Sequence, residues 1–358
     1  MKEAEILDKI RSDIDDIDQK LLELLNQRMD LVKEVGKVKK NSNSSIYRPE
    51  REKAIIQRLS QINTGKLNQQ AIEAIFLEIF AVSRNIELPE KVAYLGPEGS
   101  FTHQAAEERF GAMSEYLPLK NIQSVFEAVT SDRVKYGVVP IENNQQGIVG
   151  ETMSQLSSTT INIVAEIPMP IHFSFASLNE NIGEITHIYS KDIAFRQCAK
   201  FLKEYISNNA VMIPVESTSR AAQLASQTKS SASICSHIAA KMYNLPILFE
   251  NIQDSADNYT RFLIISSEYK NMISESDKTT ILARISDKPG SLVTFLHKFH
   301  EAGVNFTKIE SYPAKDGKKF KYWFFIEFDG HIDDPKIQKV LEVNEDQIKW
   351  LGSYPKLC

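Results

Sequence analysis

The chain has little of what disulfide-bonded, metal-binding or membrane-spanning proteins need. Three of its 358 residues are cysteines, Cys198, Cys235 and Cys358, an odd number without the paired spacing of a metal site. This predicts free thiols in a reducing compartment. No apolar run is long enough to cross a bilayer, and the charged N-terminus lacks the apolar core of a signal peptide. We therefore expect a cytoplasmic protein without a membrane partner.

Several motifs of catalysis and binding are missing as well. The sequence has no Gly-x-x-x-x-Gly-Lys-Ser/Thr phosphate loop, and neither a histidine pair nor a carboxylate cluster has metal-ligand spacing, so no metal is expected. A net charge of −5 argues against non-specific nucleic-acid binding. What is present, 42% hydrophobic and 25% charged residues, is typical of globular proteins, and the length indicates two or three domains.

Residues 1–88 are expected to form an all-helical domain, because they show no strand pattern and contain only two glycines. From Ile10 the apolar residues recur at alternating steps of four and three, which predicts one long amphipathic helix that ends near Lys40. Further helices are expected from Pro49 and after Asn68. Three such thin helices cannot bury a core alone, so we expect an intertwined homodimer, or a higher homo-oligomer, with pockets between helices.

Arg28 occupies a position within the apolar stripe of the first helix. A guanidinium group there is costly unless an anion meets it. Lys39 follows eleven residues later, about three turns, and projects on nearly the same face. Two interpretations remain open at this point. One is a pocket for a small anion with more than one acidic group, and the other is an intramolecular salt bridge or a register-setting polar residue.

After a short linker at 88–90, strands alternate with helices, which indicates an α/β layer fold. The strand Val92–Leu95 leads through a glycine-containing turn into a helix, and backbone N–H groups at such a turn form a weak candidate anion site. Polar residues stand at strand ends, namely Asn143, Ser190 and Thr260. Because open α/β sheets bind ligands at strand ends, we expect a ligand site there.

A polar, serine-rich linker at 266–278 precedes the last segment. The order strand, helix, strand, strand, helix, strand then predicts a small ferredoxin-like α+β domain over 278–358. Its first helix begins at the turn before Ser291. Such domains usually serve assembly or ligand sensing.

Four stretches carry recognisable motifs: VAYLGPEGSFTHQAA at 92–106, VVPIENNQQGIVGET at 138–152, NYTRF at 258–262 and DKPGSLVTFLHKFHEAGVNFTKIESYP at 287–313. The first three resemble the prephenate dehydratase signatures, and the fourth resembles the phenylalanine-binding ACT segment. The first segment resembles all-helical chorismate mutases through EVGKVK at 34–39 and RE at 51–52. Along nearly its whole length the chain is thus similar to the bifunctional chorismate mutase–prephenate dehydratases of phenylalanine biosynthesis.

The resemblance implies three domains: an all-α mutase domain at 1–88, a two-lobed, periplasmic-binding-protein-like α/β dehydratase domain at 91–268, and an ACT domain at 278–358. It implies that chorismate is rearranged to prephenate, that prephenate is decarboxylated and dehydrated to phenylpyruvate, and that L-phenylalanine inhibits. Neither reaction requires a cofactor. The alternative is a phenylalanine-sensing or small-anion-binding protein without catalysis.

The resemblance also implies the residues of each site. The mutase residues are Arg11 from the partner subunit, Arg28, Lys39, Arg51, Glu52, Ser83 and Glu87, of which Arg28, Lys39 and Glu87 are expected to be catalytic. The dehydratase residues are Ser100, Thr102, Asn143, Ser190, Gln197, Arg261 and the catalytic Thr260. The phenylalanine residues are Gly290, Ser291, Leu292, Asn305, Glu310 and Ser311.

Two positions depart from the family pattern. Lys191 follows Ser190 where the family commonly has histidine. Tyr312 stands where the Glu-Ser-Arg-Pro motif of the ACT domain has arginine, which bears on the strength of phenylalanine feedback and not on the fold.

Overall fold

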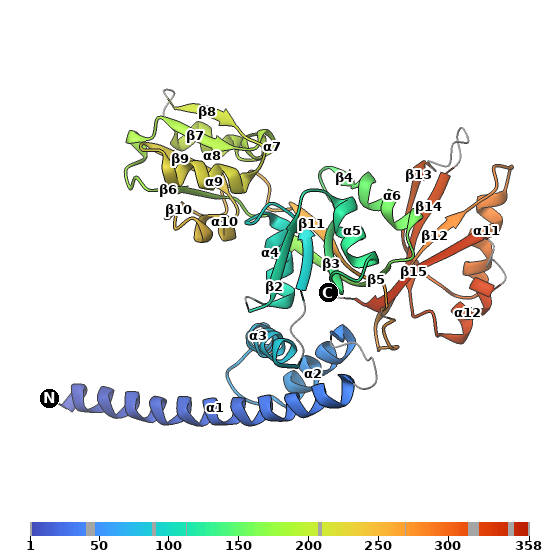
Figure 1. Cartoon of the computed structure of the whole chain (residues 1–358), viewed down its shortest axis with the longest axis horizontal. Helices are drawn as coiled ribbons and strands as arrows, with labels where there is room; N and C mark the ends of the chain where they lie inside the picture. The colour runs from blue at the N-terminus through green and yellow to red at the C-terminus, as the bar shows by residue number, and fades with distance from the viewer. Residues whose placement is uncertain are drawn as a thin grey trace.

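The structure is a computed structural model that describes residues 2–40, 47–87, 91–111, 113–206, 210–268, 270–313, 322–342 and 347–356. A helical unit, a two-lobed α/β unit and a small α+β unit follow one another along the chain (Figure 1). The predicted linker at 88–90 lies outside the described residues.

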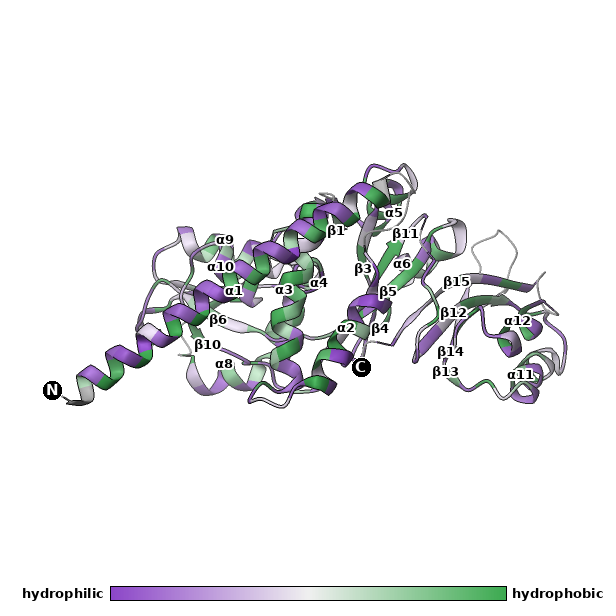
Figure 2. Ribbon diagram, turned by 90° about the horizontal axis from the view of Figure 1, so that it is seen from below, coloured by the Kyte–Doolittle hydropathy of each residue, from purple (hydrophilic) through white to green (hydrophobic). Residues whose placement is uncertain are grey.

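The helical unit consists of α1 (Lys2–Lys40), α2 (Pro49–Ile62) and α3 (Gln69–Glu87). The C-terminal part of α1 lies against α3, which in turn contacts α2, whereas the N-terminal part of α1 projects away from the rest of the chain (Figure 1). Apolar and polar residues alternate along α1 in Figure 2. The apolar stripe is about half exposed to solvent, with Ile10 at 50%, Ile14 at 51% and Leu21 at 52%. One chain alone therefore leaves this stripe uncovered.

The first lobe of the α/β unit is built on a mixed sheet in the order β2-β1-β3-β11-β5, with β4 paired to β3. Its strands are β1 (Lys91–Leu95), β2 (Glu115–Leu119), β3 (Tyr136–Asn143), β4 (Gly147–Ile148), β5 (Asn162–Pro170) and β11 (Tyr259–Ser266). Its helices are α4 (Phe101–Phe110), α5 (Ile122–Thr130) and α6 (Gly150–Ser158). Strand β1 is parallel to β2 and β3, and β11 is antiparallel to both of its neighbours, β3 and β5.

The second lobe carries a sheet in the order β10-β6-β9-β7-β8. Its strands are β6 (Ser174–Ser177), β7 (His187–Ser190), β8 (Val211–Pro214), β9 (Ser231–Cys235) and β10 (Ile247–Phe249). Its helices are η1 (Ile182–Glu184), α7 (Asp192–Gln197), α8 (Ala199–Tyr205), α9 (Thr218–Gln227) and α10 (His237–Met242). The chain leaves the first lobe after β5 and returns to it at β11, so two crossings join the lobes.

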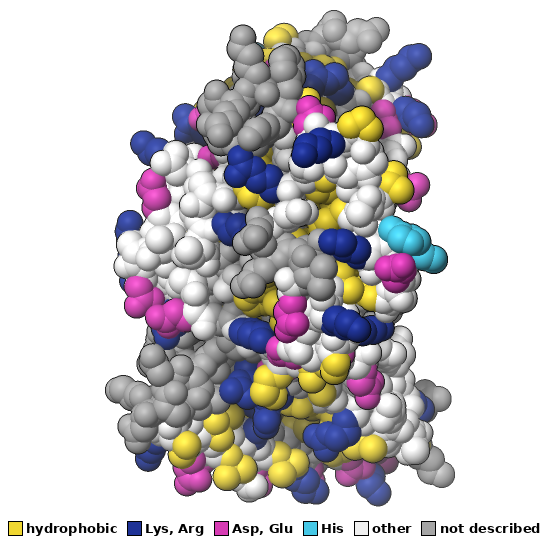
Figure 3. Space-filling model, turned by 90° about the vertical axis from the view of Figure 1, so that its right-hand side faces the viewer, with side chains coloured by type: hydrophobic (Ala, Val, Ile, Leu, Met, Phe, Trp, Pro, Cys, Tyr) yellow, Lys and Arg dark blue, Asp and Glu magenta, His cyan; other side chains and the backbone are white. Residues whose placement is uncertain are grey.

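The last unit is a four-stranded antiparallel sheet in the order β13-β14-β12-β15. Its elements are β12 (Asp277–Arg284), α11 (Ser291–Glu301), β13 (Phe306–Pro313), β14 (Tyr322–Asp329), α12 (Pro335–Glu342) and β15 (Ile348–Pro355). The helices cover one face of the sheet around buried Phe295, Phe299 and Phe328. Figure 3 shows the surface at this end, where yellow apolar side chains lie among dark blue basic ones.

The other face of this small sheet is buried against the first lobe. Leu282 and Leu351 share one apolar cluster with Val139 and Leu263 of the lobe's sheet. Gly352 of β15 lies so close to β5 that a Cβ there would be 2.1 Å from the carbonyl oxygen of Ile163. The small domain is therefore fastened to the same sheet that carries β3 and β11.

The predicted fold class is confirmed, but several elements differ from the pattern. Strands β2, β8 and β10 were not expected, and β8 is an exposed edge strand without hydrophobic alternation. Strand β6 begins only at Ser174, because the residues between β5 and β6 form a crossing between the lobes.

Two further sequence expectations concern thiols and membranes. Cys198 and Cys235 are free and buried, and burial raises their thiol pKa values to about 12 and about 11, respectively. Cys358 lies outside the described residues. Within the described chain, we find no helix with the length and apolar character needed to cross a membrane.

Candidate active sites

A cavity of about 270 Å³ lies between the three helices of the first unit. Five residues predicted for the mutase line it: Arg28, Arg51, Glu52, Ser83 and Glu87. Their neighbours in the lining are Val32, Val35, Arg48, Ile55, Phe80 and Arg84. The helical periods of α1, α2 and α3 thus bring predicted residues from three separate segments to one place.

Of the remaining two predicted mutase residues, Arg11 does not line this cavity. Arg11 lies in the exposed part of α1, where its Nη1 atom is 3.5 Å from Oδ1 of Asp8 on the same helix. Lys39 belongs to α1 by its backbone, but its side chain lies outside the described residues.

Arg28 reaches into the cavity from α1. Its Nη1 donates a hydrogen bond to the hydroxyl of Ser83, which in turn donates to the carbonyl of Ile79 at 2.5 Å. Its guanidinium carbon lies 5.8 Å from the centroid of the Phe80 ring. Burial and then the charge of Arg51 lower the pKa of Arg28. Two cations that disfavour each other in one cavity favour the interpretation as an anion pocket.

Glu52 is buried in the wall of the same cavity, with 7% of its surface exposed. Its Oε1 pairs with Nη1 of Arg84, and its Oε2 lies 3.2 Å from Nη2 of Arg109. Sequence reasoning missed both arginines. Arg84 directly follows the predicted Ser83, whereas Arg109 comes from α4 of the next unit and had no signal in the sequence.

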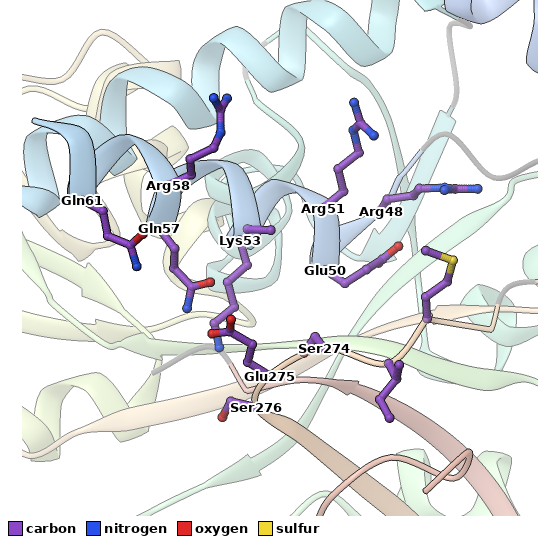
Figure 4. Close-up of a pocket in the computed structure, with 13 residues that line it drawn as sticks. Arg48, Glu50, Arg51, Lys53, Gln57, Arg58, Gln61, Ser274, Glu275 and Ser276 are labelled. Carbon is purple, nitrogen blue, oxygen red and sulfur yellow. The ribbon is translucent and has the colours of Figure 1, made fainter.

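A second cavity, of about 430 Å³, lies on the other side of α2, against residues 272–276 (Figure 4). Arg48 and Arg51 line both cavities. Figure 4 shows Lys53 directed toward the linker and Arg51 directed away from it. The Nζ atom of Lys53 donates to the carbonyl of Lys356 at 2.5 Å, so α2 is also tied to the end of β15.

The cleft between the lobes of the α/β unit holds a cavity of about 350 Å³. Five predicted residues line it: Ser100, Thr102, Asn143, Gln197 and Thr260. Ser100 caps α4, because its Oγ accepts from the backbone N–H of His103 at 3.2 Å. The turn before it requires glycine at position 99, where φ is +76°. The second lobe contributes Lys191, Ile193, Glu216, Ser217 and Thr218 to the lining.

Asn143 and Thr260 face each other across β3 and β11, where they are paired in register. The Nδ2 atom of Asn143 lies 2.9 Å from Oγ1 of Thr260 and 3.0 Å from Oδ1 of Asn258. Its Oδ1 accepts the backbone N–H groups of Gln145 and Gln146 at 3.0 and 3.1 Å, which fixes the orientation of the amide. The hydroxyl of Thr260 is therefore the acceptor in this pair, and its own proton is free to donate into the cleft.

A series of hydrogen bonds between side-chain amides continues from this pair to the second lobe. Nδ2 of Asn258 donates to Oε1 of Gln197 at 3.4 Å, and Nε2 of Gln197 donates to Oε1 of Gln145 at 2.8 Å. Asn258 is 2% exposed and lines the cleft. Sequence reasoning did not select Asn258, although it is the first residue of the NYTRF motif.

Two predicted substrate-binding residues, Ser190 and Arg261, are not among the residues that line the cleft. Ser190 is fully buried, and its Oγ donates to the carbonyl of Ile234 at 2.7 Å. Arg261 follows Thr260 on a strand, so the pleat directs its side chain to the opposite face. There it meets the small domain that covers this face of the sheet.

Arg261 is the centre of an ion network between the first lobe and the small domain. It lies 3.1 Å from Glu142, 3.0 Å from Glu166 and 2.5 Å from Glu327. Two lysines complete the network: Lys278 is 2.8 Å from Glu166, and Lys308 pairs with Glu142. Burial alone would raise the pKa of Glu142, but Lys308 and Arg261 together lower it below its ordinary value.

Among the cavities found in the described part of the chain, one is lined by a residue predicted for phenylalanine binding. A cavity of about 650 Å³ in the small domain is lined by Arg284, Ser286, Lys288 and Phe324, among others, and by Leu292 of the predicted set. Gly290 adopts a φ of +83° before α11, and the hydroxyls of Ser291 and Ser286 lie 2.9 Å apart. Asn305 donates to Asp329 at 3.4 Å, and Glu310 and Ser311 are exposed on the edge strand β13.

Tyr312 follows Ser311 on β13 and reaches the first lobe. Its hydroxyl donates to the carbonyl of Gly150, at the start of α6, at 2.8 Å. The residue that replaces the arginine of the ACT motif thus contacts the α/β unit directly.

Three family models match the three units in order. They describe chorismate mutase type II over residues 10–88, prephenate dehydratase over 92–270 and the ACT domain over 279–346. The bifunctional chorismate mutase/prephenate dehydratase of Aquifex aeolicus is 39% identical over 98% of each chain, and that of Pseudomonas aeruginosa is 36% identical over 99% of each. The chain belongs to the bifunctional chorismate mutase/prephenate dehydratase family. This confirms the predicted family and its two activities.

Solved structures agree with this assignment for the last two units. The prephenate dehydratase of Arthrobacter aurescens, solved in complex with L-Phe, is 29% identical, with a TM-score of 0.68 over 74% of this chain and 90% of that chain. The prephenate dehydratase of Staphylococcus aureus is 26% identical, with a TM-score of 0.64 over 74% of this chain and 99% of that chain. The fold of the last two units is therefore similar to that of solved prephenate dehydratases.

Proposed function

We propose that the chain converts chorismate to prephenate in the cavity between its helices and prephenate to phenylpyruvate in the cleft between its lobes. Family membership along the whole chain supports both activities. The observation that carries the second is the Asn143–Thr260 pair, which presents a hydroxyl donor to a cleft of suitable size.

The first reaction is a pericyclic rearrangement and needs neither a nucleophile nor a proton transfer. A protein accelerates it by holding the dicarboxylate in a compact conformer and by stabilising charge on the breaking ether oxygen. Arg28 and Arg51 supply the cations for the carboxylates. We assign Lys39 and Glu87 to the ether oxygen and Glu52 to the substrate hydroxyl, while Ser83 holds the guanidinium of Arg28.

We further propose that Arg11 acts in the mutase site of a second copy of the chain. It stands about 100° around α1 from Arg28, so one helix does not aim both at one ligand. The exposed apolar stripe of α1 is the surface that a second copy would cover. The proposed assembly is therefore a homodimer, or a larger oligomer built from it, in the cytoplasm.

The second reaction expels carbon dioxide and hydroxide while an aromatic ring forms. The ring supplies a large driving force, so a hydrogen bond to the departing hydroxyl is sufficient assistance. We assign that donor to Thr260, because Asn143 occupies its acceptor side and leaves its proton available. Ser100, Thr102 and Gln197 line the same cleft and are assigned to substrate binding.

We also propose that L-phenylalanine binds the ACT domain at a subunit interface near Gly290–Leu292 and Asn305–Ser311, and inhibits the dehydratase by a population shift. The exposure of β13 in the single chain leaves this edge available to a second copy. The network around Arg261 and the Tyr312–Gly150 bond connect this domain to the strands and helix next to the cleft.

The test is incubation of the purified full-length chain with chorismate, with product analysis for prephenate and phenylpyruvate, and a parallel assay that starts from prephenate. Phenylpyruvate from both substrates, with inhibition by L-phenylalanine, is the expected result. Binding of L-phenylalanine without turnover of either substrate would identify a sensor and overturn the proposal.

A further inference from the structure

The last turn of α4, in the dehydratase domain, forms part of the wall behind the mutase cavity. Arg109 is buried there, and its Nη2 lies 3.2 Å from Oε2 of Glu52. Glu52 lines the cavity together with Arg28 and Arg51. A carboxylate of one domain's site is therefore held by a cation of the other domain.

Hydrogen bonds and ring contacts with residues of the mutase domain surround Arg109. The Nε of Arg109 donates to the hydroxyl of Tyr47 at 2.7 Å, and Nη2 of Arg84 donates to the carbonyl of Arg109 at 2.9 Å. The guanidinium carbons of Arg109 and Arg84 lie 5.4 and 5.5 Å from the centroid of the Tyr47 ring. These contacts fix the guanidinium of Arg109 in a position where its Nη2 lies within ion-pair distance of Oε2 of Glu52.

Beside this contact, the mutase and dehydratase domains pack closely against each other. Tyr47, which precedes α2, is fully buried, and its ring packs 5.1 Å from Phe110 and 5.5 Å from Tyr136 of the dehydratase core. Gly111 caps α4 with a φ of +81°, and a Cβ there would lie 2.1 Å from that of Ala81 on α3. Only glycine allows this approach of α4 to the mutase helices.

Charge explains why the mutase cavity needs Arg109. Chorismate carries two carboxylates, and the buried carboxylate of Glu52 would repel it in a medium of low dielectric. Arg84 and Arg109 together outweigh that negative charge: Arg84 donates a hydrogen bond to Oε1, and Arg109 forms an ion pair with Oε2 at 3.2 Å. A buried carboxylate that loses one of its two partners keeps an incompletely compensated charge, which is strongly disfavoured and favours its reorientation.

We propose that Arg109, a residue of the dehydratase domain, is a positioning residue of the mutase site, where it fixes the carboxylate of Glu52 for substrate. This rests on the proposed role of the helical cavity in the mutase reaction. The mutase site is then completed across the domain boundary, although all residues that touch chorismate come from the mutase helices.

The experiment compares mutase kinetics of the full-length wild type with Arg109→Gln, Glu52→Gln and the double variant, with Arg133→Gln as the control at an exposed arginine of the same domain. Arg109→Gln should lower the mutase kcat/KM by about 10-fold or more, because a buried charge pair is broken. In the Glu52→Gln background the same change should cost less than about 2-fold, because it acts through Glu52. Dehydratase kinetics on supplied prephenate should stay within about 2-fold of the wild type in all variants.

Two outcomes overturn the proposal: an unchanged mutase kcat/KM in Arg109→Gln, or an equal loss with and without Glu52→Gln. If Arg109→Gln does not fold, Arg109→Lys and Tyr47→Phe decide instead. Arg109→Lys keeps the positive charge and should retain most mutase activity. Tyr47→Phe should also lower the mutase kcat/KM, by a smaller factor than Arg109→Gln. A wild-type chain without mutase turnover but with dehydratase turnover would overturn the proposed mutase function itself.

Discussion

The amide nitrogen of Asn143 lies 2.9 Å from the hydroxyl oxygen of Thr260, across two antiparallel strands that are paired in register. The amide orientation is fixed by two backbone N–H groups, so the hydroxyl accepts from Asn143 and donates elsewhere. The Thr260 hydroxyl, which is the proposed donor, therefore has its proton available for a group in the cleft. This relationship also lets the two residues be tested separately.

Replacing Thr260 by alanine should abolish dehydration and leave mutase turnover unchanged, so that prephenate accumulates from chorismate. Replacing it by serine should keep dehydration, because the hydroxyl is retained. Arg28→Ala should have the converse effect: chorismate is not consumed, and supplied prephenate is still dehydrated. Product analysis from each substrate measures all three variants. Loss of both activities in a folded Thr260→Ala or Arg28→Ala variant would refute the assignment of separate sites.

Asn143→Asp tests the direction of the hydrogen bond with almost no change of shape. An aspartate at 143 accepts and does not donate, so the Thr260 hydroxyl would turn its proton toward the carboxylate. We expect the dehydratase kcat to fall by about 100-fold with a smaller change of KM, because the lost bond acts on the departing hydroxyl. Mutase kinetics in the same preparation serve as the control. A rise in KM with an unchanged kcat would show that Asn143 contacts the substrate instead.

Local patterns predicted the helices well, since the stripes of α1 to α3 depend only on neighbouring residues. The direction of Arg261 could not be predicted in this way. Arg261 and Thr260 are neighbours on β11, so their side chains point to opposite faces of the sheet. Whether the face of Arg261 is exposed or buried depends on the small domain that covers it, and that domain begins only after β11 has ended. The partners of Glu52 show the same limit. Arg109 lies 57 positions further along the chain and meets Glu52 only through the docking of α4 on α3.

Stability should depend on pH through Glu142. Lys308 and Arg261 lower its pKa in the folded chain, so at acid pH the unfolded chain binds more protons. Its contribution to stability is complete above the unfolded value of about 4.3 and is lost as the pH falls through the folded value. In Glu142→Gln, the midpoint of thermal unfolding should therefore change less with pH below about 5 than in the wild type. Identical pH dependence in both proteins would show that this ion network does not titrate with folding.

Tyr312 should transmit the effect of L-phenylalanine to the dehydratase. Its hydroxyl bonds to the first residue of α6, which follows β4 and the strand of Asn143. Tyr312→Phe removes only that bond, so L-phenylalanine should still bind while inhibition of dehydration weakens. Calorimetry on the full-length protein measures binding, and dehydratase assays measure inhibition. Unchanged inhibition with unchanged binding would remove Tyr312 from the regulatory path.

The apolar stripe of α1 should hold the proposed homodimer together. A carboxylate in its middle, as in Ile14→Glu combined with Leu21→Glu, places charge where a second copy would bury apolar surface, and we expect monomers by light scattering. Lys20→Glu, on the same helix but outside the stripe, is the matched control and should leave the assembly intact. Because Arg11 is proposed to act across the interface, the double variant should also lose mutase turnover. A monomer with full mutase activity would contradict the placement of Arg11 in the partner's site, and a stable dimer would contradict the role of the stripe.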